Sequence, residues 1–108
     1  MNDKMCVLLT TMANENEAQN MSQMLIDRKL AACTQEFEVN SRFRWNDTIQ
    51  TETEVVLLVK TAVDRVEATV EAIREAHSYD LPEIIVLPVT GGLPAYMDWV
   101  HSETRPNI

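Results

Sequence analysis

The sequence has 108 residues, enough for one domain with its own core, and we expect a single domain over residues 1–108. A hydrophobic fraction of 45% and a charged fraction of 24% are typical of a compact globular protein and exclude a disordered chain. The formal net charge of -8 argues against binding to nucleic acid or to an anionic membrane surface, because both need clustered Lys and Arg.

The N-terminal residues and the cysteines bear on the cellular compartment. Residues 1–4 lead straight into an apolar run of strand length, without the charged and apolar regions of a secretory signal peptide. No apolar run approaches the length that crosses a membrane. Cys6 and Cys33 lie in apolar stretches and do not make the disulfide framework of a small secreted domain. We therefore expect free thiols and a cytoplasmic protein.

The first elements expected along the chain are a buried strand and a helix. The continuous apolar run over residues 5–11 predicts a strand buried on both faces. Asn14, with Glu17 three residues later, predicts a capping box that opens a helix. The apolar side of this helix is formed by residues at helical spacing, extending toward Leu30: Ala18, Met21, Met24 and Leu25. Methionine can bind copper, but on such a stripe core packing is the favoured interpretation.

From Phe37 the pattern changes to a period of two, which predicts a strand. One side of this strand carries Phe37, Val39, Ser41, Phe43 and Trp45, and the other side carries Glu38, Asn40, Arg42 and Arg44. Asn46-Asp47 predicts a tight turn, because both side chains tolerate positive φ. Alternation then resumes from Ile49 to Val59, which completes a long hairpin.

The length of this hairpin predicts an oligomer. A strand over residues 34–45 would span roughly 40 Å, whereas a compact domain of this size has a radius of gyration of only about 13 Å. The tip must protrude from its own core or bend over it, while it carries Phe43, Trp45 and Ile49. Burial of such side chains is worth on the order of 2 kcal/mol each, and exposure on an edge invites aggregation. A second copy of the chain is the natural cover; the alternative is a bent hairpin that packs on its own helices.

The second half of the chain predicts a helix, a short strand and a last helix. Thr61 is the expected N-cap of the first of these helices. Apolar residues then recur at spacings of three and four on one side of it, ending at a histidine: Val63, Val66, Val70, Ile73 and His77. Pro82 forces an extended path into a strand over residues 84–87. Pro94 begins the last helix, and the residues from Thr104 onward predict a frayed tail.

The order strand, helix, strand, strand, helix, strand, with a helix appended, predicts the fold class. This is the α+β arrangement called split βαβ or ferredoxin-like, in which an antiparallel sheet carries helices on one face. The long hairpin is expected to project from that sheet.

The candidate metal ligands are His77 and Glu83, six residues apart across a turn, because imidazole and carboxylate suit copper, zinc or nickel. Two ligands do not make a site, so His77 is also interpreted as a helix-ending residue and Glu83 as a surface carboxylate. Tyr79 is most simply a packing ring with a satisfied hydroxyl. Arg42 and Arg44, on the polar side of the hairpin, can meet an anionic ligand in a cleft between subunits or be solvated strand residues. No catalytic residue is predicted, since no nucleophile elbow, reactive cysteine or P-loop is present.

Several short segments form a recognisable set: residues 30–33, 42–45, 56–61, 77–84 and the tail 96–99. Together they resemble the CutA family of divalent-ion (copper) tolerance proteins, and the match runs from about Cys6 to Ser102. The resemblance implies a ferredoxin-like fold in a tight homotrimer with interlocking hairpins. It also implies a link to tolerance of copper and other divalent ions, a likeness to trimeric PII-type signalling proteins, and no firmly established enzymatic activity.

The chain departs from the family pattern at positions linked to metal. Ser78 and Asp80 replace the proline and first glutamate of the motif His-Pro-Tyr-Glu-x-Pro-Glu. Thr10 and Ala76 stand where some members have a copper-linked cysteine and a second histidine. The leading hypothesis is therefore a trimeric ion-response protein that binds Cu(II) or another divalent cation weakly through His77 and Glu83. The alternative is a PII-like regulator that binds a small anion or a protein partner at clefts between subunits.

Overall fold

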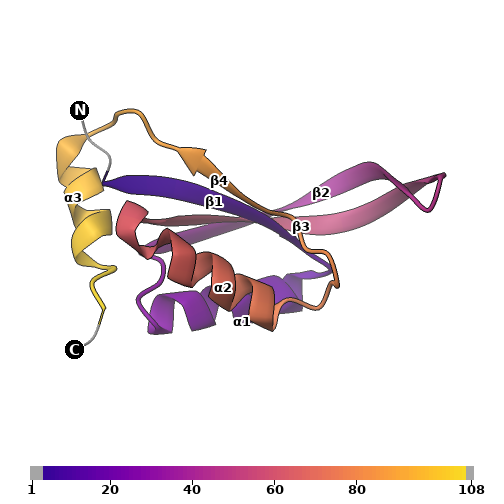
Figure 1. The fold of residues 1–108 in the computed structure, drawn as a ribbon, viewed down its shortest axis with the longest axis horizontal. Helices are drawn as coiled ribbons and strands as arrows, with labels where there is room; N and C mark the ends of the chain where they lie inside the picture. Colours follow the sequence, from indigo (N-terminus) through magenta and orange to yellow (C-terminus); the bar gives the residue numbers. More distant parts are fainter. Residues whose placement is uncertain (1–3, 107–108) are drawn as a thin grey trace.

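Strands and helices follow one another in the predicted order in a computed structural model that describes residues 4–106. The elements are β1 (Met5–Met12), α1 (Glu15–Asp27), β2 (Cys33–Trp45), β3 (Thr48–Ala62), α2 (Val66–Ala76), β4 (Ile84–Pro88) and α3 (Pro94–Ser102). The strands form one antiparallel sheet in the order β2-β3-β1-β4. Both α1 and α2 lie on one side of it, and α3 sits at one end (Figure 1). The predicted ferredoxin-like α+β fold is confirmed.

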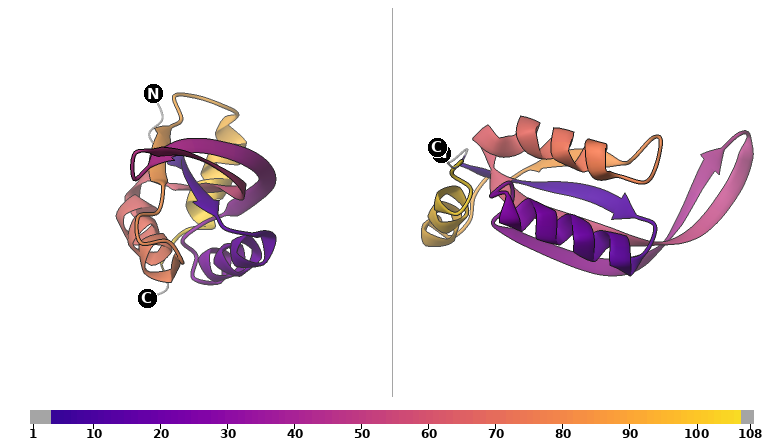
Figure 2. Two further views of the ribbon diagram at one scale, coloured as in Figure 1. Left: turned by 90° about the vertical axis from the view of Figure 1, so that its right-hand side faces the viewer. Right: turned by 90° about the horizontal axis from the view of Figure 1, so that it is seen from below.

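The main core lies between the sheet and the two helices α1 and α2. It includes fully buried side chains from the central strands and from both helices: Leu8, Leu25, Leu57, Val59 and Ile73. A smaller cluster of Met5, Met97 and Val100 forms beneath α3. The end-on view shows α1 and α2 side by side on the same side of the sheet (Figure 2, left). Most of the opposite side of the sheet is therefore left uncovered by α1 and α2, while α3 packs on Met5 at one end of it.

The start of α1 matches its sequence signal. Asn14 has an extended backbone, and its side-chain oxygen accepts a 2.9 Å hydrogen bond from the Glu17 N–H, so Asn14 caps the helix as predicted. In return, the side-chain amide of Asn14 donates to Oε2 of Glu17 at 3.4 Å. Lys29, just past the helix end, adopts a left-handed φ of 57°. The chain then turns back so that the N–H groups of Leu30 and Ala31 both donate to the Leu25 carbonyl. Leu30 is thereby buried in the core although it lies outside the helix.

The predicted start of α2 is wrong. Thr61 does not cap the helix, because it pairs with Cys6 in the β1–β3 ladder and β3 continues to Ala62. A single 3-10 turn over Val63–Arg65 follows, and α2 begins at Val66. The fully buried Thr61 belongs to the sheet, where tertiary pairing outweighs a local capping preference. The buried side of α2 consequently begins after Val63, which is 46% exposed.

The predicted frayed tail is also wrong for the residues that follow α3. Thr104 is fully buried, and its hydroxyl donates a 2.9 Å hydrogen bond to the Val100 carbonyl. The Arg105 guanidinium donates to both carboxylate oxygens of Asp64, at 2.6 and 2.7 Å. These contacts hold the end of α3 against the chain that leaves β3.

β2 and β3 continue far beyond the other strands. They pair from Cys33–Lys60 to Trp45–Thr48, whereas β1 pairs with β3 only as far as Val55. Residues 39–54 therefore form a two-stranded ribbon, which projects to the right in Figure 1 and curves in Figure 2 (right). The molecule is 45 Å long but only 28 Å and 21 Å across. Asn46 and Asp47 close the ribbon with φ values of 50° and 62°, the two-residue turn that the sequence predicts.

The ribbon projects away from α1 and α2 (Figure 1). The alternative expectation, a bent hairpin that packs on its own helices, is therefore wrong. Phe43, Trp45 and Ile49 are 39%, 50% and 66% exposed. The ladder pairs also show that Ile49 lies opposite Arg44, on the other side of the ribbon from Phe43 and Trp45. Both sides of the ribbon thus present large apolar side chains to solvent in the single chain.

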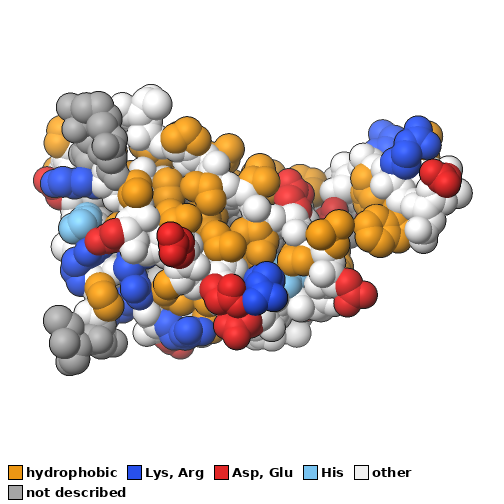
Figure 3. Space-filling model, in the orientation of Figure 1, with side chains coloured by type: hydrophobic (Ala, Val, Ile, Leu, Met, Phe, Trp, Pro, Cys, Tyr) orange, Lys and Arg blue, Asp and Glu red, His pale blue; other side chains and the backbone are white. Residues whose placement is uncertain are grey.

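The side of the sheet opposite α1 and α2 forms an open apolar face. Residues that lie opposite one another in the ladders share a side, which groups Val7 with Leu87, Leu9 with Ile85 and Leu58, and Val56 with Phe37. Ile85, Leu87 and Phe37 are 44%, 40% and 51% exposed. Figure 3, in which the sheet is seen from its β4 edge, shows hydrophobic side chains along that edge. We use the term open sheet face for the side of the sheet that carries Phe37, Val56, Leu58, Ile85 and Leu87.

Candidate functional site

The segment between α2 and β4 is held to the sheet by His77. Its Nε2 atom lies 2.8 Å from the Thr11 carbonyl oxygen, and its Nδ1 atom lies 3.1 Å from the Tyr79 backbone nitrogen. A carbonyl only accepts and a backbone N–H only donates, so Nε2 carries the proton and Nδ1 accepts. Both imidazole nitrogens are therefore engaged, and His77 ties the loop to the end of β1.

Tyr79 extends this connection to the hairpin. Its ring centroid lies 4.9 Å from that of His77, and its hydroxyl donates a 2.8 Å hydrogen bond to Oε2 of Glu54. Burial raises the pKa of Tyr79, and the hydrogen bond to the Glu54 carboxylate raises it further. The phenol thus remains a neutral donor, and the interpretation of Tyr79 as a packing ring with a satisfied hydroxyl is confirmed.

Glu54 is the member of this group that the sequence analysis missed. It is only 8% exposed, which is unusual for a carboxylate. It stands where the alternating pattern of the hairpin changes into the apolar run that starts at Val55. A charged residue at that transition is the signal that could have identified it.

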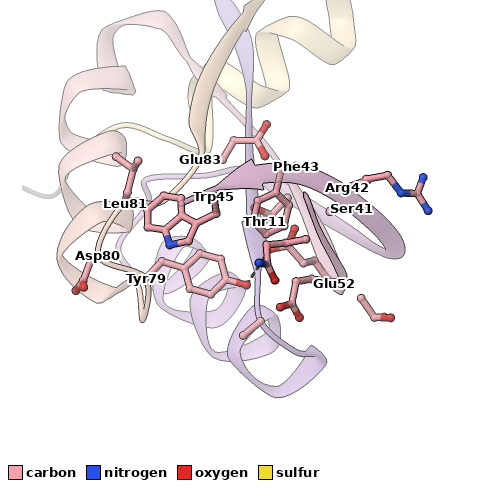
Figure 4. A pocket seen from close by; sticks show the side chains of 14 residues that line it. Thr11, Ser41, Arg42, Phe43, Trp45, Glu52, Tyr79, Asp80, Leu81 and Glu83 are labelled. Carbon is pink, nitrogen blue, oxygen red and sulfur yellow. Dashed lines mark hydrogen bonds between the residues drawn. The ribbon is translucent and has the colours of Figure 1, made fainter. Parts of the chain in front are cut away.

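A cleft of about 820 Å³ lies between the hairpin and the loop that contains Tyr79. Its walls include the aromatic rings of Phe43, Trp45 and Tyr79. Four carboxylates also line it, those of Glu52, Glu54, Asp80 and Glu83. Figure 4 shows the rings of Trp45 and Tyr79 projecting toward this space, whereas the guanidinium of Arg42 extends away from it. The cleft combines aromatic surface with negative charge.

The two predicted metal ligands, His77 and Glu83, lie in different environments. Glu83 is exposed and lines the cleft just before β4, whereas His77 is half-buried and is not among the residues that line it. Within residues 4–106, no group of three or more His, Cys, Asp or Glu side chains is placed to hold a metal ion. The described part of one chain therefore does not make a complete coordination site.

Cys6 and Cys33 are both free, as predicted. Burial raises the pKa of the Cys6 thiol, which disfavours the reactive thiolate.

Among the described residues, no helix is long and apolar enough to span a bilayer.

The fold, the projecting hairpin and the loop anchored by His77 define a small ferredoxin-like protein built around an extended β-ribbon. The family model described as "CutA1 divalent ion tolerance protein" matches residues 6–103. The chain belongs to the CutA1 family, and the resemblance found in the sequence is confirmed.

Related proteins and structures agree with this assignment. The chloroplastic protein CutA of Arabidopsis thaliana is 32% identical over 100 residues, which cover 92% of this chain and 55% of that protein. The divalent-cation tolerance protein CutA of Escherichia coli is 34% identical over 100 residues, covering 92% of this chain and 89% of that protein. This chain spans only about half the length of the Arabidopsis thaliana and Mus musculus proteins that it matches.

Solved structures match nearly the whole chain. CutA from Synechococcus elongatus PCC7942 superposes with a TM-score of 0.93 at 35% identity, covering 96% of this chain and 93% of that one. The periplasmic divalent cation tolerance protein CutA from Archaeoglobus fulgidus gives a TM-score of 0.91 at 29% identity, covering 94% and 99%.

Proposed function

We propose that this chain functions in divalent-cation tolerance as a homotrimer that binds Cu(II) or another divalent cation weakly through His77 and Glu83. Membership of the CutA1 family supports the general role. Escherichia coli and Archaeoglobus fulgidus relatives carry divalent-cation tolerance in their names. The proposed role is one of binding and response, and it assigns no reaction to the chain.

The main support for the proposed homotrimer is the apolar surface that a single chain leaves uncovered. Within residues 4–106, no third strand pairs with the two-stranded ribbon of residues 39–54. An isolated two-stranded ribbon is at best marginally stable in water. The open sheet face adds Phe37, Ile85 and Leu87, each at least 40% exposed. Large exposed apolar patches mark interaction surfaces, and further copies of the same chain would cover both features.

Light scattering of the purified protein tests the assembly directly. The expected mass is three times the 12.3 kDa of the chain. A stable monomer over a wide range of concentrations would refute the homotrimer and the site arguments that depend on it.

The structure gives a physical reason to expect weak cation binding. A cation that coordinates His77 must displace its hydrogen bond to either the Thr11 carbonyl or the Tyr79 N–H. Such a bond contributes about 1 kcal/mol in the folded protein. Glu83 is exposed, so its carboxylate must also give up water.

Calorimetric titration with Cu(II) tests this site. His77→Ala is expected to weaken binding, whereas His101→Ala, which removes the other histidine of the chain, is expected to leave it unchanged. Equal affinities in the wild-type protein and in His77→Ala would remove His77 as a ligand. Glu83→Gln tests the second ligand in the same way.

A cytoplasmic location remains a prediction. The Arabidopsis thaliana relative is named chloroplastic and the Archaeoglobus fulgidus relative is named periplasmic, so relatives occupy different compartments. Fractionation of the cells that express this chain, followed by immunodetection, distinguishes these locations.

A second candidate function is a PII-like regulator that binds a small ligand or a protein partner at clefts between subunits. The cleft of about 820 Å³ favours it, because ligand pockets commonly fall between about 300 and 1,000 Å³. A thermal-shift screen with nucleotides and metabolites tests it. The absence of any shift at millimolar concentrations would count against a small ligand.

A further inference from the structure

The cleft beside the hairpin is negative as well as aromatic. Glu52 lies opposite Ser41 in the ladder and thus on the same side of the ribbon as Phe43 and Trp45. Glu83 contributes a second carboxylate from the start of β4, and the carboxylate of Glu54 is already bonded to Tyr79. The one basic residue of the lining, Arg42, directs its guanidinium away from the cleft (Figure 4).

In the single chain, the aromatic rings of the cleft are partly exposed to solvent. Phe43 is 39% exposed and Trp45 is 50% exposed, although both lie at a concave surface. The face of an aromatic ring carries negative potential and attracts cations, most strongly in tryptophan. Where rings lie beside carboxylates, both groups attract the positive charge of a ligand. The rings also provide apolar contact for its hydrocarbon.

From this combination we propose that the cleft binds an organic ammonium cation, with its hydrocarbon against Phe43 and Trp45 and its charge facing Glu52 and Glu83. The aromatic rings supply dispersion and cation–π attraction, and the carboxylates supply charge complementarity. This goes beyond metal binding at His77, which does not line the cleft. It also deepens the second candidate function, because it names the class of small ligand.

The same observations disfavour other ligand classes for this cleft. A metal ion needs several ligands that converge on one point, and no such group of side chains is present within residues 4–106. An anion would face the carboxylates of Glu52 and Glu83 without the Arg42 guanidinium turned toward it. An extended cation that combines ammonium groups with hydrocarbon fits a lining that contains both carboxylates and rings.

Tryptophan fluorescence gives a direct test in the assembled protein. The chain has two tryptophans, so Trp99→Phe leaves Trp45 as the single reporter within the cleft. Spermidine is the probe, a neutral diol of similar length tests the need for charge, and Mg²⁺ tests whether charge alone is sufficient. We expect the fluorescence emission of Trp45 to change saturably with spermidine, and not with the diol or with Mg²⁺.

Two variants in this background identify the groups that bind. Glu52→Gln is expected to weaken spermidine binding about fivefold by removing a carboxylate. Phe43→Leu, which keeps apolar bulk but removes the ring, is expected to weaken it about threefold. Glu38→Gln is the matched control, because Glu38 lies on the other side of the hairpin beside Val55 and does not line the cleft.

The outcomes separate this proposal from the others. No saturable change with spermidine at millimolar concentration, including the case in which a second copy fills the cleft, would overturn it. So would equal affinity in the Glu52→Gln and Glu38→Gln proteins, or an equal response to Mg²⁺. Copper titration of His77→Ala tests the proposed metal ligand separately. The metal site and the ammonium site can therefore be refuted independently of each other.

Discussion

The hydroxyl of Tyr79 and the carboxylate of Glu54 join the loop after α2 to the strand that enters the hairpin, through a 2.8 Å hydrogen bond. Glu54 is almost completely buried, so the bond from Tyr79 replaces water that the carboxylate has lost. Since His77 ties the same loop to Thr11, the loop is held at two points. One wall of the cleft is therefore fixed relative to the ribbon.

Tyr79→Phe is predicted to destabilise the protein by about 1–3 kcal/mol, because it leaves the Glu54 carboxylate buried without its donor. Urea unfolding at one fixed chain concentration measures the change, since assembly makes apparent stability concentration-dependent. Tyr96→Phe serves as the control, because it keeps the ring that lies beneath the Lys60 ammonium. Equal effects of both substitutions would contradict the role given to the Tyr79 hydroxyl.

The raised pKa of Tyr79 predicts a loss of stability at alkaline pH. Burial and the Glu54 hydrogen bond raise the pKa in the folded chain above the value of about 10 for a free tyrosine. The stabilisation is complete below the unfolded pKa and is lost as pH rises from there toward the folded pKa. Unfolding curves from neutral to alkaline pH are expected to show this loss, and the Tyr79→Phe protein is expected to lack this contribution.

Phe37→Asp is predicted to dissociate the proposed homotrimer. Phe37 is 51% exposed on the open sheet face, so a single chain tolerates the change, whereas an interface formed there would bury an unpaired charge. Light scattering is expected to give a lower mass while circular dichroism keeps the signature of the fold. Glu38→Gln, on the opposite side of the same strand, is expected to keep the mass of the wild-type protein. An unchanged mass for Phe37→Asp would place the interface elsewhere.

Asp47→Gly is predicted to stabilise the hairpin by up to about 1 kcal/mol. Asn46 and Asp47 both adopt positive φ, a region that costs most L-residues about 1–2 kcal/mol and glycine almost nothing. Asn-Gly is also the preferred pair in this turn. Thermal or urea unfolding measures the gain, and Asp47→Ala is expected to destabilise instead. A loss of stability in Asp47→Gly would show that the Asp47 side chain has a role of its own.

Arg105→Gln is predicted to lower stability by up to about 1 kcal/mol, a small effect because the pair with Asp64 is largely exposed. The hydrogen bond and charge of Arg105 lower the pKa of Asp64. The stabilisation is therefore present above the ordinary carboxyl pKa of about 4 and is lost as pH falls through the lowered value. The difference between the two proteins should shrink in acid and in high salt. A difference that persists in acid would contradict this origin.

The regular elements were predictable because their signals are local. Alternation from Phe37 to Trp45 requires a strand, and Asn46-Asp47 supplies residues that tolerate the turn. The boundary at Thr61 was missed because its pairing with Cys6 across the sheet outweighs its preference for a helix cap. The order of the tail was missed because Arg105 finds its partner 41 residues away, at Asp64.

The site was less predictable than the fold because it depends on curvature and long-range packing. His77 and Glu83 could be named from residue chemistry, but only the structure shows that Glu83 lines the cleft and that His77 does not. Trp45 and Tyr79 meet at the cleft because the ribbon curves and the loop is tied to Glu54. Neither the curvature nor the tie has a signature in a single stretch of sequence.

β3 runs without interruption from the turn at Thr48 to Ala62, half in the four-stranded sheet and half in the ribbon. Amide protons in its core half, near Leu57, are expected to exchange with solvent only when the whole domain unfolds. Amide protons in its ribbon half, near Thr51, are released by local fraying in the isolated chain. Hydrogen exchange along β3 therefore measures two free energies of opening, one for its core half and one for its ribbon half. If the free energy of opening of the ribbon half rises with protein concentration, a second copy of the chain binds there.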